Sequence, residues 1–255
     1  MKLTFIGNGN MAKALIQGLV TSCTIEVLGR NKKSLDALQK ELPNITTKLL
    51  SNEEDITGKE IVLCVKPYSL TDLAPKLKGT ADCIYSVLAG TSIESLQSKI
   101  QAKSYIRTMP NLGASYLKSM TTITGDEVLK NKAVEIFEKI GTTLWLSSEN
   151  ELDIATGVAG SGPAYLALIA ESLADGAVKS GLKREDSQKL VQGLFDGFAE
   201  LIKYENPALI KDGVMSPGGT TAAGYGALER CNVRHGMMEA VSDAYKKALE
   251  LKQKN

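Results

Sequence analysis

The feature that most constrains the fold of this chain is the stretch Gly7-Asn8-Gly9-Asn10-Met11-Ala12, which directly follows a short apolar run, Leu3–Ile6. A helical pattern through Leu15 and Leu19 comes next. Strand, Gly-x-Gly-x-x-Ala and helix, in this order, form the dinucleotide-binding arrangement of a Rossmann domain, with Ala12 in the close-packing third position. The glycines let a pyrophosphate approach the backbone at the helix N-terminus, so we expect a dinucleotide site here.

The end of the second predicted strand, Ile25–Leu28, carries cations where an NAD site would carry an acid. An NAD site holds the ribose 2′-hydroxyl with an Asp or Glu at this point, whereas Glu26 lies inside the strand. The next residues are Gly29-Arg30-Asn31-Lys32-Lys33, and cations with an amide suit a 2′-phosphate. Arg30 therefore favours NADPH, while Lys32 and Lys33 can also be read as the solvated first turn of a helix.

Three later strands should bring their carboxyl ends to one crevice. The apolar runs Ile61–Val65 and Cys83–Val87 are typical of parallel strands covered on both faces, and Ser104–Ile106 follows them. Their ends read Val65-Lys66-Pro67, Leu88-Ala89-Gly90-Thr91 and Arg107-Thr108-Met109-Pro110-Asn111. Ligands of open α/β sheets bind beyond the carboxyl ends of the strands, so we expect these segments to line one site. Plain turn chemistry is the alternative for each of them.

The alternation of strands and helices ends after two further predicted strands, Thr121–Ile123 and Thr142–Leu146, which should close the sheet. Long helical patterns follow at Ala164–Leu182, Arg184–Lys203 and Val233–Lys254. We therefore predict an α/β Rossmann dinucleotide-binding domain over 1–152 and an all-α domain over 153–255. About a hundred residues in a few helices make a thin bundle with a limited core, so we expect the helical domain to pair with a second copy as a homodimer.

Two glycine-rich segments each precede a predicted helix in the second half. In Ser216-Pro217-Gly218-Gly219-Thr220-Thr221, the proline fixes one φ and the glycines allow a sharp turn into the helix. Free N–H groups at a helix start, together with two hydroxyls, make an anion site. Gly160-Ser161-Gly162-Pro163 likewise has good capping residues. A plain capped turn is the alternative for each segment, yet the two together indicate a shared small-molecule pocket.

The composition argues against several classes of protein. The chain has 30 Lys and Arg against 29 Asp and Glu, a net charge of +1, so nothing indicates a nucleic-acid or charged membrane partner. The four cysteines are scattered and form no metal-ligand cluster, which predicts no metal site and a reducing compartment. No signal peptide precedes the first strand and no apolar run approaches membrane-spanning length, so we expect a soluble cytoplasmic protein.

The inventory of acids and bases limits the chemistry of the site. The single histidine, His235, has no neighbouring nucleophile or carboxylate motif and is interpreted as structural or exposed. Reduction of a ketone needs an acid for the alkoxide, whereas a protonated imine is already a cationic electrophile. A hydroxyl donor, an anion site for a carboxylate and NADPH would suffice for an imine.

These motifs together resemble the pyrroline-5-carboxylate reductase family, which makes proline. The resemblance extends over nearly the whole chain and rests most on Gly160-Ser161-Gly162-Pro163-Ala164-Tyr165 and Ser216-Pro217-Gly218-Gly219-Thr220-Thr221. It implies a Rossmann domain with a C-terminal helical dimerisation domain, often in larger rings. It also implies an NAD(P)H-dependent oxidoreductase that transfers hydride to the C=N carbon of 1-pyrroline-5-carboxylate and gives L-proline.

The resemblance further implies roles for individual residues. Thr221 would be the catalytic residue at the ring nitrogen, and the carboxylate would lie on Ser216, Gly218, Gly219 and Thr220. The implied cofactor residues are Gly7, Asn8, Gly9, Asn10 and Met11 at the pyrophosphate, Arg30 and Asn31 at the 2′-phosphate, Asn52 at the ribose, and Val65, Lys66, Pro67, Ala89 and Gly90 toward the nicotinamide. Gly29-Arg30-Asn31 departs from the family pattern and leaves use of NAD(H) open.

Two other functions remain compatible with the sequence. A β-hydroxyacid dehydrogenase has a related two-domain architecture, but it needs a lysine on the first long helix of the second domain. Lys179 is the only candidate, and it lies far from the glycine-rich start of that helix. A nucleotide-sensing protein without catalysis would bind NADPH but would leave the loop Ser216–Thr221 without a purpose.

Overall fold

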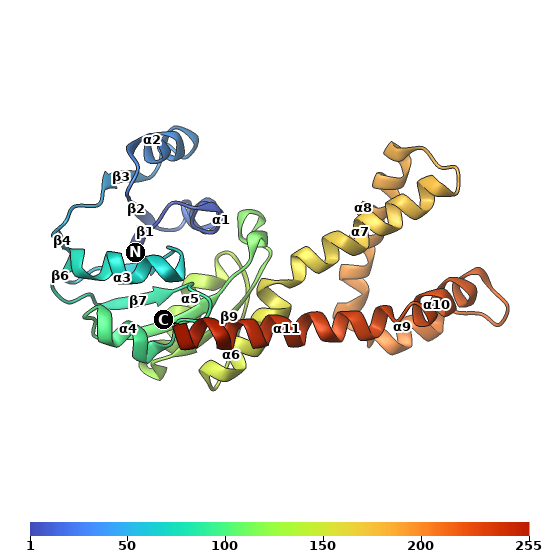
Figure 1. Cartoon of the computed structure of the whole chain (residues 1–255). Helices are drawn as coiled ribbons and strands as arrows, with labels where there is room; N and C mark the ends of the chain where they lie inside the picture. The colour runs from blue at the N-terminus through green and yellow to red at the C-terminus, as the bar shows by residue number, and fades with distance from the viewer. Residues whose placement is uncertain (255) are drawn as a thin grey trace. The chain divides into compact units, whose positions relative to one another are not determined.

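The computed structural model describes residues 1–254, with side chains described through Lys252 (Figure 1). The chain forms two compact units, one of Met1–Ser161 with the residues from Val241 onward, and one of Gly162–Ala240. These bounds differ from the predicted division at 152/153. The first boundary lies later because residues between Glu149 and Ala159 are hydrogen-bonded to Arg107 and Asn111 of the first unit. The last helix, α11 (Val233–Lys254), begins in the second unit and ends in the first.

The first unit is built on an eight-stranded sheet with the order β10-β9-β8-β7-β5-β1-β2-β3. The strands are β1 (Lys2–Ile6), β2 (Thr24–Gly29), β3 (Thr46–Leu49), β5 (Glu60–Leu63), β7 (Cys83–Ser86), β8 (Tyr105–Met109), β9 (Ser119–Gly125) and β10 (Gly141–Trp145). All neighbours run parallel except β8 and β9. From β3 to β8 this is the strand order of a Rossmann fold, whose direction of winding reverses between β1 and β5. The short strands β4 (Glu54–Asp55) and β6 (Leu77–Lys78) form a separate pair.

Every strand predicted from the sequence is present, and the predicted fold class is confirmed. Some details differ from the prediction. β3 was not predicted, because its sequence Thr-Thr-Lys-Leu lacks an apolar run and the strand lies at the edge of the sheet. β4 and β6 were not predicted either, because two residues each are too few to show a pattern. β8 continues to Met109, so Arg107 and Thr108 lie within a buried strand and not beyond its end.

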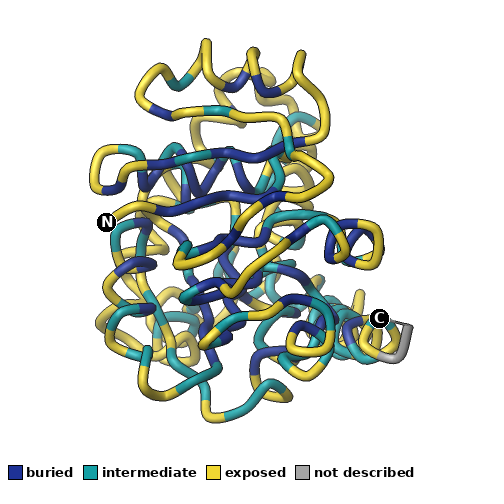
Figure 2. Tube along the Cα trace, turned by 90° about the vertical axis from the view of Figure 1, so that its left-hand side faces the viewer, coloured by how far each residue is buried: buried dark blue, intermediate teal, exposed yellow. Residues whose placement is uncertain are grey.

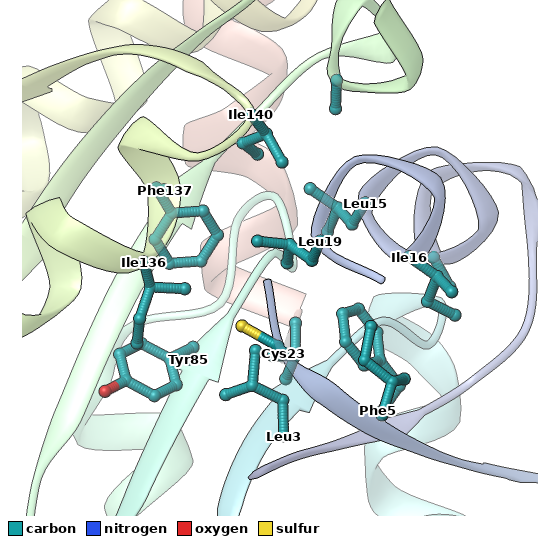
Figure 3. Packing of buried hydrophobic residues seen from close by; sticks show 14 of the residues in the cluster. Leu3, Phe5, Leu15, Ile16, Leu19, Cys23, Tyr85, Ile136, Phe137 and Ile140 are labelled. Carbon is teal, nitrogen blue, oxygen red and sulfur yellow. The ribbon is translucent and has the colours of Figure 1, made fainter. Parts of the chain in front are cut away.

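The core of the first unit lies on both faces of the sheet, whose strands form its buried centre (Figure 2). Alternate residues of β1 point to opposite faces: Leu3 and Phe5 join one apolar cluster and Ile6 joins the other. On the first face, Leu15 and Leu19 pack near Phe137, and Tyr85 meets Phe137 edge to face at 6.0 Å between ring centroids (Figure 3). This packing holds the first helix against the sheet, and the turn that joins β1 to that helix is held with it.

The helices of the first unit cover the sheet and lead out of it. They are α1 (Asn10–Leu19), α2 (Lys32–Glu41), α3 (Leu70–Leu73), α4 (Ile93–Lys99), α5 (Lys130–Glu138) and α6 (Glu149–Ala155), the last continuing into a π-helical turn (Thr156–Gly160). α6 is held to β8 by the buried Arg107, which donates to Glu149 at 2.9 Å and to Asp153 at 2.7 Å.

The second unit is helical, with α7 (Gly162–Lys179), α8 (Arg184–Tyr204), α9 (Pro207–Val214), α10 (Thr220–Arg230) and the first part of α11. All but α9 were predicted. Among the described residues of α7 to α10, only Ala174 and Ser187 are buried within the single chain. The unit therefore lacks a core of its own in one copy, as expected for a thin bundle.

One expectation about apolar runs is corrected. Within the described residues, the continuous helical stretch Glu149–Lys179 is long and apolar enough to cross a membrane by length and composition alone, with a mean hydropathy of 1.3 in its most apolar window. Only 17% of that window is buried within the chain. Many alanines with scattered Leu and Ile raise the hydropathy of this stretch without forming a run of large apolar residues, which is why the sequence did not suggest it.

Candidate functional site

The turn after β1 requires glycine at its first position. Gly7 has φ +110°, and a Cβ there would lie 2.5 Å from the carbonyl oxygen of Cys64. Its N–H donates to the carbonyl of Leu28 at 2.8 Å. The turn is thus fixed between β2 and β5, at the point where the strand order reverses.

The N-terminus of α1 is open to a ligand. Gly9 is the capping residue, no side chain caps the helix, and its first turn carries no acid. The first intrahelical bond runs from Lys13 N–H to Gly9, so the N–H groups of Asn10 and Met11 have no partner within the helix. A Cβ at Gly9 would have nothing within 4 Å. This cradle fits the pyrophosphate of a dinucleotide.

A cavity of about 860 Å³ opens at this edge of the sheet, wholly within the first unit. Of the residues predicted to bind the cofactor, its lining includes Gly7, Asn8, Gly9, Asn10, Met11, Arg30, Asn31, Val65, Lys66, Pro67 and Ala89. Its lining also includes Leu50, Ser69, Asp72, Leu73, Lys76 and Leu112, which were not predicted, and Gly160, which belongs to a segment predicted to contribute to a pocket. Ser69 to Lys76 follow Lys66-Pro67 directly, but only the fold shows that this segment turns back along the cavity.

The end of β2 carries a cation and no acid. Arg30 is exposed and forms no ion pair with any described residue. Asn31 caps α2 through its Oδ1, which accepts from the Ser34 N–H at 3.1 Å and leaves the amide nitrogen available. Glu26 lies 3.6 Å from the Lys59 ammonium, so this strand acid is already paired. The guanidinium of Arg30 and the side-chain amide of Asn31 together fit a 2′-phosphate.

Two predicted cofactor residues lie outside the lining of the cavity. Asn52 is exposed in the loop after β3. Gly90 has φ +63°, and a Cβ there would lie 2.4 Å from Cβ of Leu251, so this glycine allows α11 to approach the backbone after β7. The close packing of α11 thus explains why glycine is needed at position 90, which the sequence did not reveal.

The segment after β8 forms another wall of the cavity. Asn111 donates from Nδ2 to the carbonyl of Ala159 at 2.9 Å and accepts from the Gly113 N–H at 2.9 Å. It thereby holds the π-helical turn beside Leu112, and Gly160 at the end of that turn lines the cavity. The side chain of Arg107, by contrast, is buried against α6 and is not part of the lining.

Cys64 is the one cysteine in the lining of this cavity. Burial raises the pKa of its thiol, which keeps it protonated and unreactive near neutral pH. Among the described residues, no group of three or more His, Cys, Asp or Glu is placed to hold a metal ion.

The predicted substrate loop lies in the second unit, between α9 and α10. Gly218 has φ +70°, a left-handed conformation that glycine adopts without strain, and the Gly219 N–H donates to the carbonyl of Ser216 at 3.0 Å. A Cβ at Gly219 would lie 2.5 Å from the hydroxyl oxygen of Ser216. The loop therefore needs both glycines to fold back on Ser216.

The start of α10 offers donors without partners. Gly219 caps the helix with no side-chain bond, and the first turn contains no acid. Thr220 is exposed and Thr221 half-buried, and neither hydroxyl has a hydrogen bond to another described residue. Free N–H groups and hydroxyls at a helix start suit a carboxylate.

Neither rival base is placed for catalysis. His235 is exposed on α11, as expected. Lys179 lies in the last turn of α7, at the opposite end of that helix from Gly162. A lysine acid near the start of α7, which a β-hydroxyacid dehydrogenase would need, is absent from this described helix.

Two family models match separate parts of the chain. Residues 149–251 match the family "Pyrroline-5-carboxylate reductase dimerisation", and residues 2–90 match "NADP oxidoreductase coenzyme F420-dependent". The second match covers the strands and loops that form most of the cavity.

Similar proteins extend over the full length. A pyrroline-5-carboxylate reductase of Synechocystis is 38% identical, covering 100% of this chain and 99% of that protein, and one of Helicobacter pylori J99 is 33% identical, covering 96% and 98%. The crystal structure of the enzyme from Streptococcus pyogenes covers 98% of both chains with a TM-score of 0.87 at 28% identity. A Plasmodium falciparum pyrroline carboxylate reductase solved with NADP bound covers 99% of this chain and 98% of that chain, with a TM-score of 0.84 at 28% identity. The chain therefore belongs to the pyrroline-5-carboxylate reductase family.

Proposed function

We propose that this chain reduces the C=N bond of 1-pyrroline-5-carboxylate to give L-proline, the last step of proline biosynthesis. The observation that carries the proposal is the cavity of the first unit. It combines the open N-terminus of α1 with the cation Arg30 at the end of β2. The chain belongs to the pyrroline-5-carboxylate reductase family, and its residues 2–90 match an NADP oxidoreductase model.

The residues of the cavity support a defined cofactor arrangement. NADPH, when bound, supplies the hydride for the reduction. Asn10 and Met11 would bind the pyrophosphate through their backbone N–H groups, and Arg30 with the amide of Asn31 would bind the 2′-phosphate. The nicotinamide would lie toward Val65, Lys66, Pro67 and Ala89, with Asn52 at the adenosine ribose. Gly90 would contribute through its backbone.

The loop of the second unit would hold the substrate. Ser216 and Thr220 would donate hydroxyls to the carboxylate, joined by backbone N–H groups of Gly218 and Gly219, and Thr221 would hydrogen-bond the ring nitrogen. Because a protonated imine is already cationic, the chain needs no strong acid at this point. The free hydroxyl of Thr221 orients the ring without having to supply a full proton.

The two parts of the chain would have separate roles. We propose that residues 1–152 bind the cofactor, and that 153–255 bind the substrate and form the interface of a homodimer that can assemble into a larger ring. The cytoplasm is the proposed location, since Cys23, Cys64, Cys83 and Cys231 are all free thiols and suit a reducing compartment.

The test is the loss of NADPH absorbance with and without 1-pyrroline-5-carboxylate, repeated with NADH. We expect oxidation that depends on the imine and is faster with NADPH. In the Arg30→Ala variant, we expect KM for NADPH to rise while KM for NADH changes little, because the guanidinium would meet only the 2′-phosphate.

Other outcomes would redirect the proposal. NADPH binding without turnover of any cyclic imine would favour the nucleotide-sensing function. Oxidation of a 3-hydroxy acid with NADP+, without turnover of the imine, would favour a β-hydroxyacid dehydrogenase. If Arg30→Ala changed KM equally for NADPH and NADH, Arg30 would not be a ligand of the 2′-phosphate.

A further inference from the structure

The substrate loop has few contacts of its own. Ser216, Pro217 and Gly218 are exposed, and the bond from Gly219 N–H to Ser216 is the one backbone hydrogen bond within 215–219. The direction in which the loop presents its donors therefore depends on the angle between α9, which ends before it, and α10, which begins after it.

Tyr225 joins the helices on either side of this loop. The Lys211 ammonium on α9 lies 5.7 Å from the centroid of the Tyr225 ring, within the range of a cation–π interaction. The hydroxyl of Tyr225 accepts a hydrogen bond from Nη2 of Arg234 on α11 at 2.5 Å. Arg234 is itself held by Glu229, one turn further along α10, at 2.5 Å. One side chain of α10 thus contacts α9 through its ring and α11 through its hydroxyl.

The position of Tyr225 connects these contacts to the chemistry. It follows Thr221 by four residues on the same helix, so the two side chains lie on the same face of α10, one turn apart. A rotation or tilt of α10 that moved Tyr225 away from Lys211 and Arg234 would move Thr221 and the loop with it.

The ion pair between Arg234 and Glu229 is largely exposed in the single chain. The side chain of Arg234 is 63% exposed and that of Glu229 is 41% exposed. Exposed ion pairs contribute little to the free energy of unfolding, because solvent screens them. A small interaction energy still suffices to favour one loop orientation over another. A tenfold change in the ratio of two populations needs only a modest difference in their free energies.

We propose that Tyr225, braced by Lys211 and Arg234, is a positioning residue that sets the orientation of the loop Ser216–Thr221 for binding the substrate carboxylate. The inference rests on the proposed function of that loop. It assigns to Tyr225, through its contacts with Lys211 and Arg234, the role of stabilising the loop orientation that binds the carboxylate.

The experiment compares variants that remove one contact at a time. Tyr225→Phe keeps the ring for Lys211 but removes the hydroxyl that Arg234 reaches, and Lys211→Met removes the cation but keeps the tyrosine. Lys211→Arg is the conservative rescue, since it restores a cation over the ring. Tyr204→Phe is the matched control, because Tyr204 is an exposed tyrosine of the same unit, at the end of α8.

The measured quantities are KM and kcat for 1-pyrroline-5-carboxylate, Kd for L-proline and for NADPH by calorimetry, and the thermal unfolding midpoint. We expect Tyr225→Phe and Lys211→Met each to raise KM and the L-proline Kd about three- to tenfold, the scale of one exposed cation–π or charged hydrogen bond. We expect kcat, the NADPH Kd and the midpoint to stay near wild type, and Lys211→Arg to restore KM.

The outcomes separate this inference from the proposed function. Wild-type protein without imine-dependent NADPH oxidation would overturn the proposed function and this inference with it. An active wild type whose Tyr225→Phe variant matches Tyr204→Phe in KM and L-proline Kd would overturn this inference alone. So would a fall in the unfolding midpoint that accounts for the rise in KM, because Tyr225 would then serve stability.

Discussion

Thr221 and Glu54 illustrate, at the scale of single residues, two opposite environments for a polar group. Thr221 is half-buried at the start of α10 and its hydroxyl has no hydrogen bond to another described residue. Glu54 is fully buried in β4 and accepts from Lys48 at 2.8 Å and from Lys59 at 3.3 Å. A free hydroxyl is available for a ligand, whereas a buried carboxylate that is fully paired serves the fold.

The Thr221 hydroxyl should matter for turnover and not for stability. Thr221→Ala is expected to reduce kcat/KM by an amount equivalent to about 1–3 kcal/mol, the scale of a lost hydrogen bond to a buried group. Thr221→Ser keeps the hydroxyl and should retain most of the activity. Steady-state kinetics on both variants is the measurement, and unchanged kcat/KM in Thr221→Ala would remove this residue from the mechanism.

Glu54 should give the fold a dependence on pH. Burial alone would raise the pKa of this carboxyl, but the ammonium groups of Lys48 and Lys59 outweigh burial and hold the pKa below its usual value of 4.5. A lowered folded pKa means that the stabilisation is fully present above pH 4.5 and is lost as the pH falls through the folded value.

Glu54→Gln is therefore expected to lower the free energy of unfolding at pH 7 by about 1–3 kcal/mol, the cost of leaving buried partners poorly paired. Denaturant unfolding of both proteins between pH 7 and pH 3 should show the difference shrinking below pH 4.5. Asp36→Asn, which breaks an exposed pair with Lys32, is the control and should change little at any pH. If the difference in unfolding free energy stayed constant from pH 7 to pH 3, the charge of Glu54 would not contribute to stability.

At the scale of elements, the β1–α1 turn contains two glycines that are needed for different reasons. Gly7 has a positive φ and would clash with the backbone of Cys64 if it carried a Cβ. Gly9 has φ −76°, an ordinary conformation, and faces open space at the cap of α1. The first glycine is required by the fold, and the second is expected to be required by the ligand.

Alanine substitutions should separate these two requirements. Gly9→Ala is expected to leave the thermal unfolding midpoint of the free protein unchanged but to raise the Kd for NADPH at least about tenfold, because the methyl group occupies the approach to the free N–H groups. Gly7→Ala should destabilise the free protein itself, by about 1–3 kcal/mol, because of backbone strain. Calorimetric binding and thermal unfolding of both variants test the pair, and NADPH affinity unchanged in Gly9→Ala would place the pyrophosphate elsewhere.

At the scale of the whole molecule, the second unit presents more apolar surface than one copy can bury. Along α8, Leu190, Leu194, Phe198 and Leu201 recur at helical spacing and are all exposed. This helix lies within residues 149–251, the part that matches the dimerisation family. A second copy of the unit would cover such a stripe, and would also account for the exposed apolar residues of Glu149–Lys179.

Association should therefore depend on this stripe. The wild-type chain of 27.3 kDa is expected to show at least twice that mass in light scattering at micromolar concentration. Leu194→Glu places a charge within the stripe and should lower the mass toward that of one chain, while Gln192→Glu, off the stripe, should not. A wild-type mass of one chain would overturn the proposed dimer.

The sequence alone determined the fold class and the chemistry that belongs to local motifs. Gly-x-Gly-x-x-Ala after the first strand, the cations beyond Leu28 and the loop Ser216–Thr221 each depend on neighbouring residues, because turn geometry and helix capping are local. The predicted strands and long helices followed from apolar periodicity for the same reason. Sequence patterns therefore pointed to eleven of the residues that line the cavity, from Gly7 to Ala89.

Only the tertiary structure decided what depends on residues far apart in the chain. Gly90 packs against Leu251, Arg107 turns inward to Asp153, and Asp72 and Lys76 line the cavity because α3 folds back along it. The bracing of Tyr225 by Lys211 and Arg234 joins three helices. None of these contacts leaves a periodic or local signal, since each arises from the way separate elements pack together.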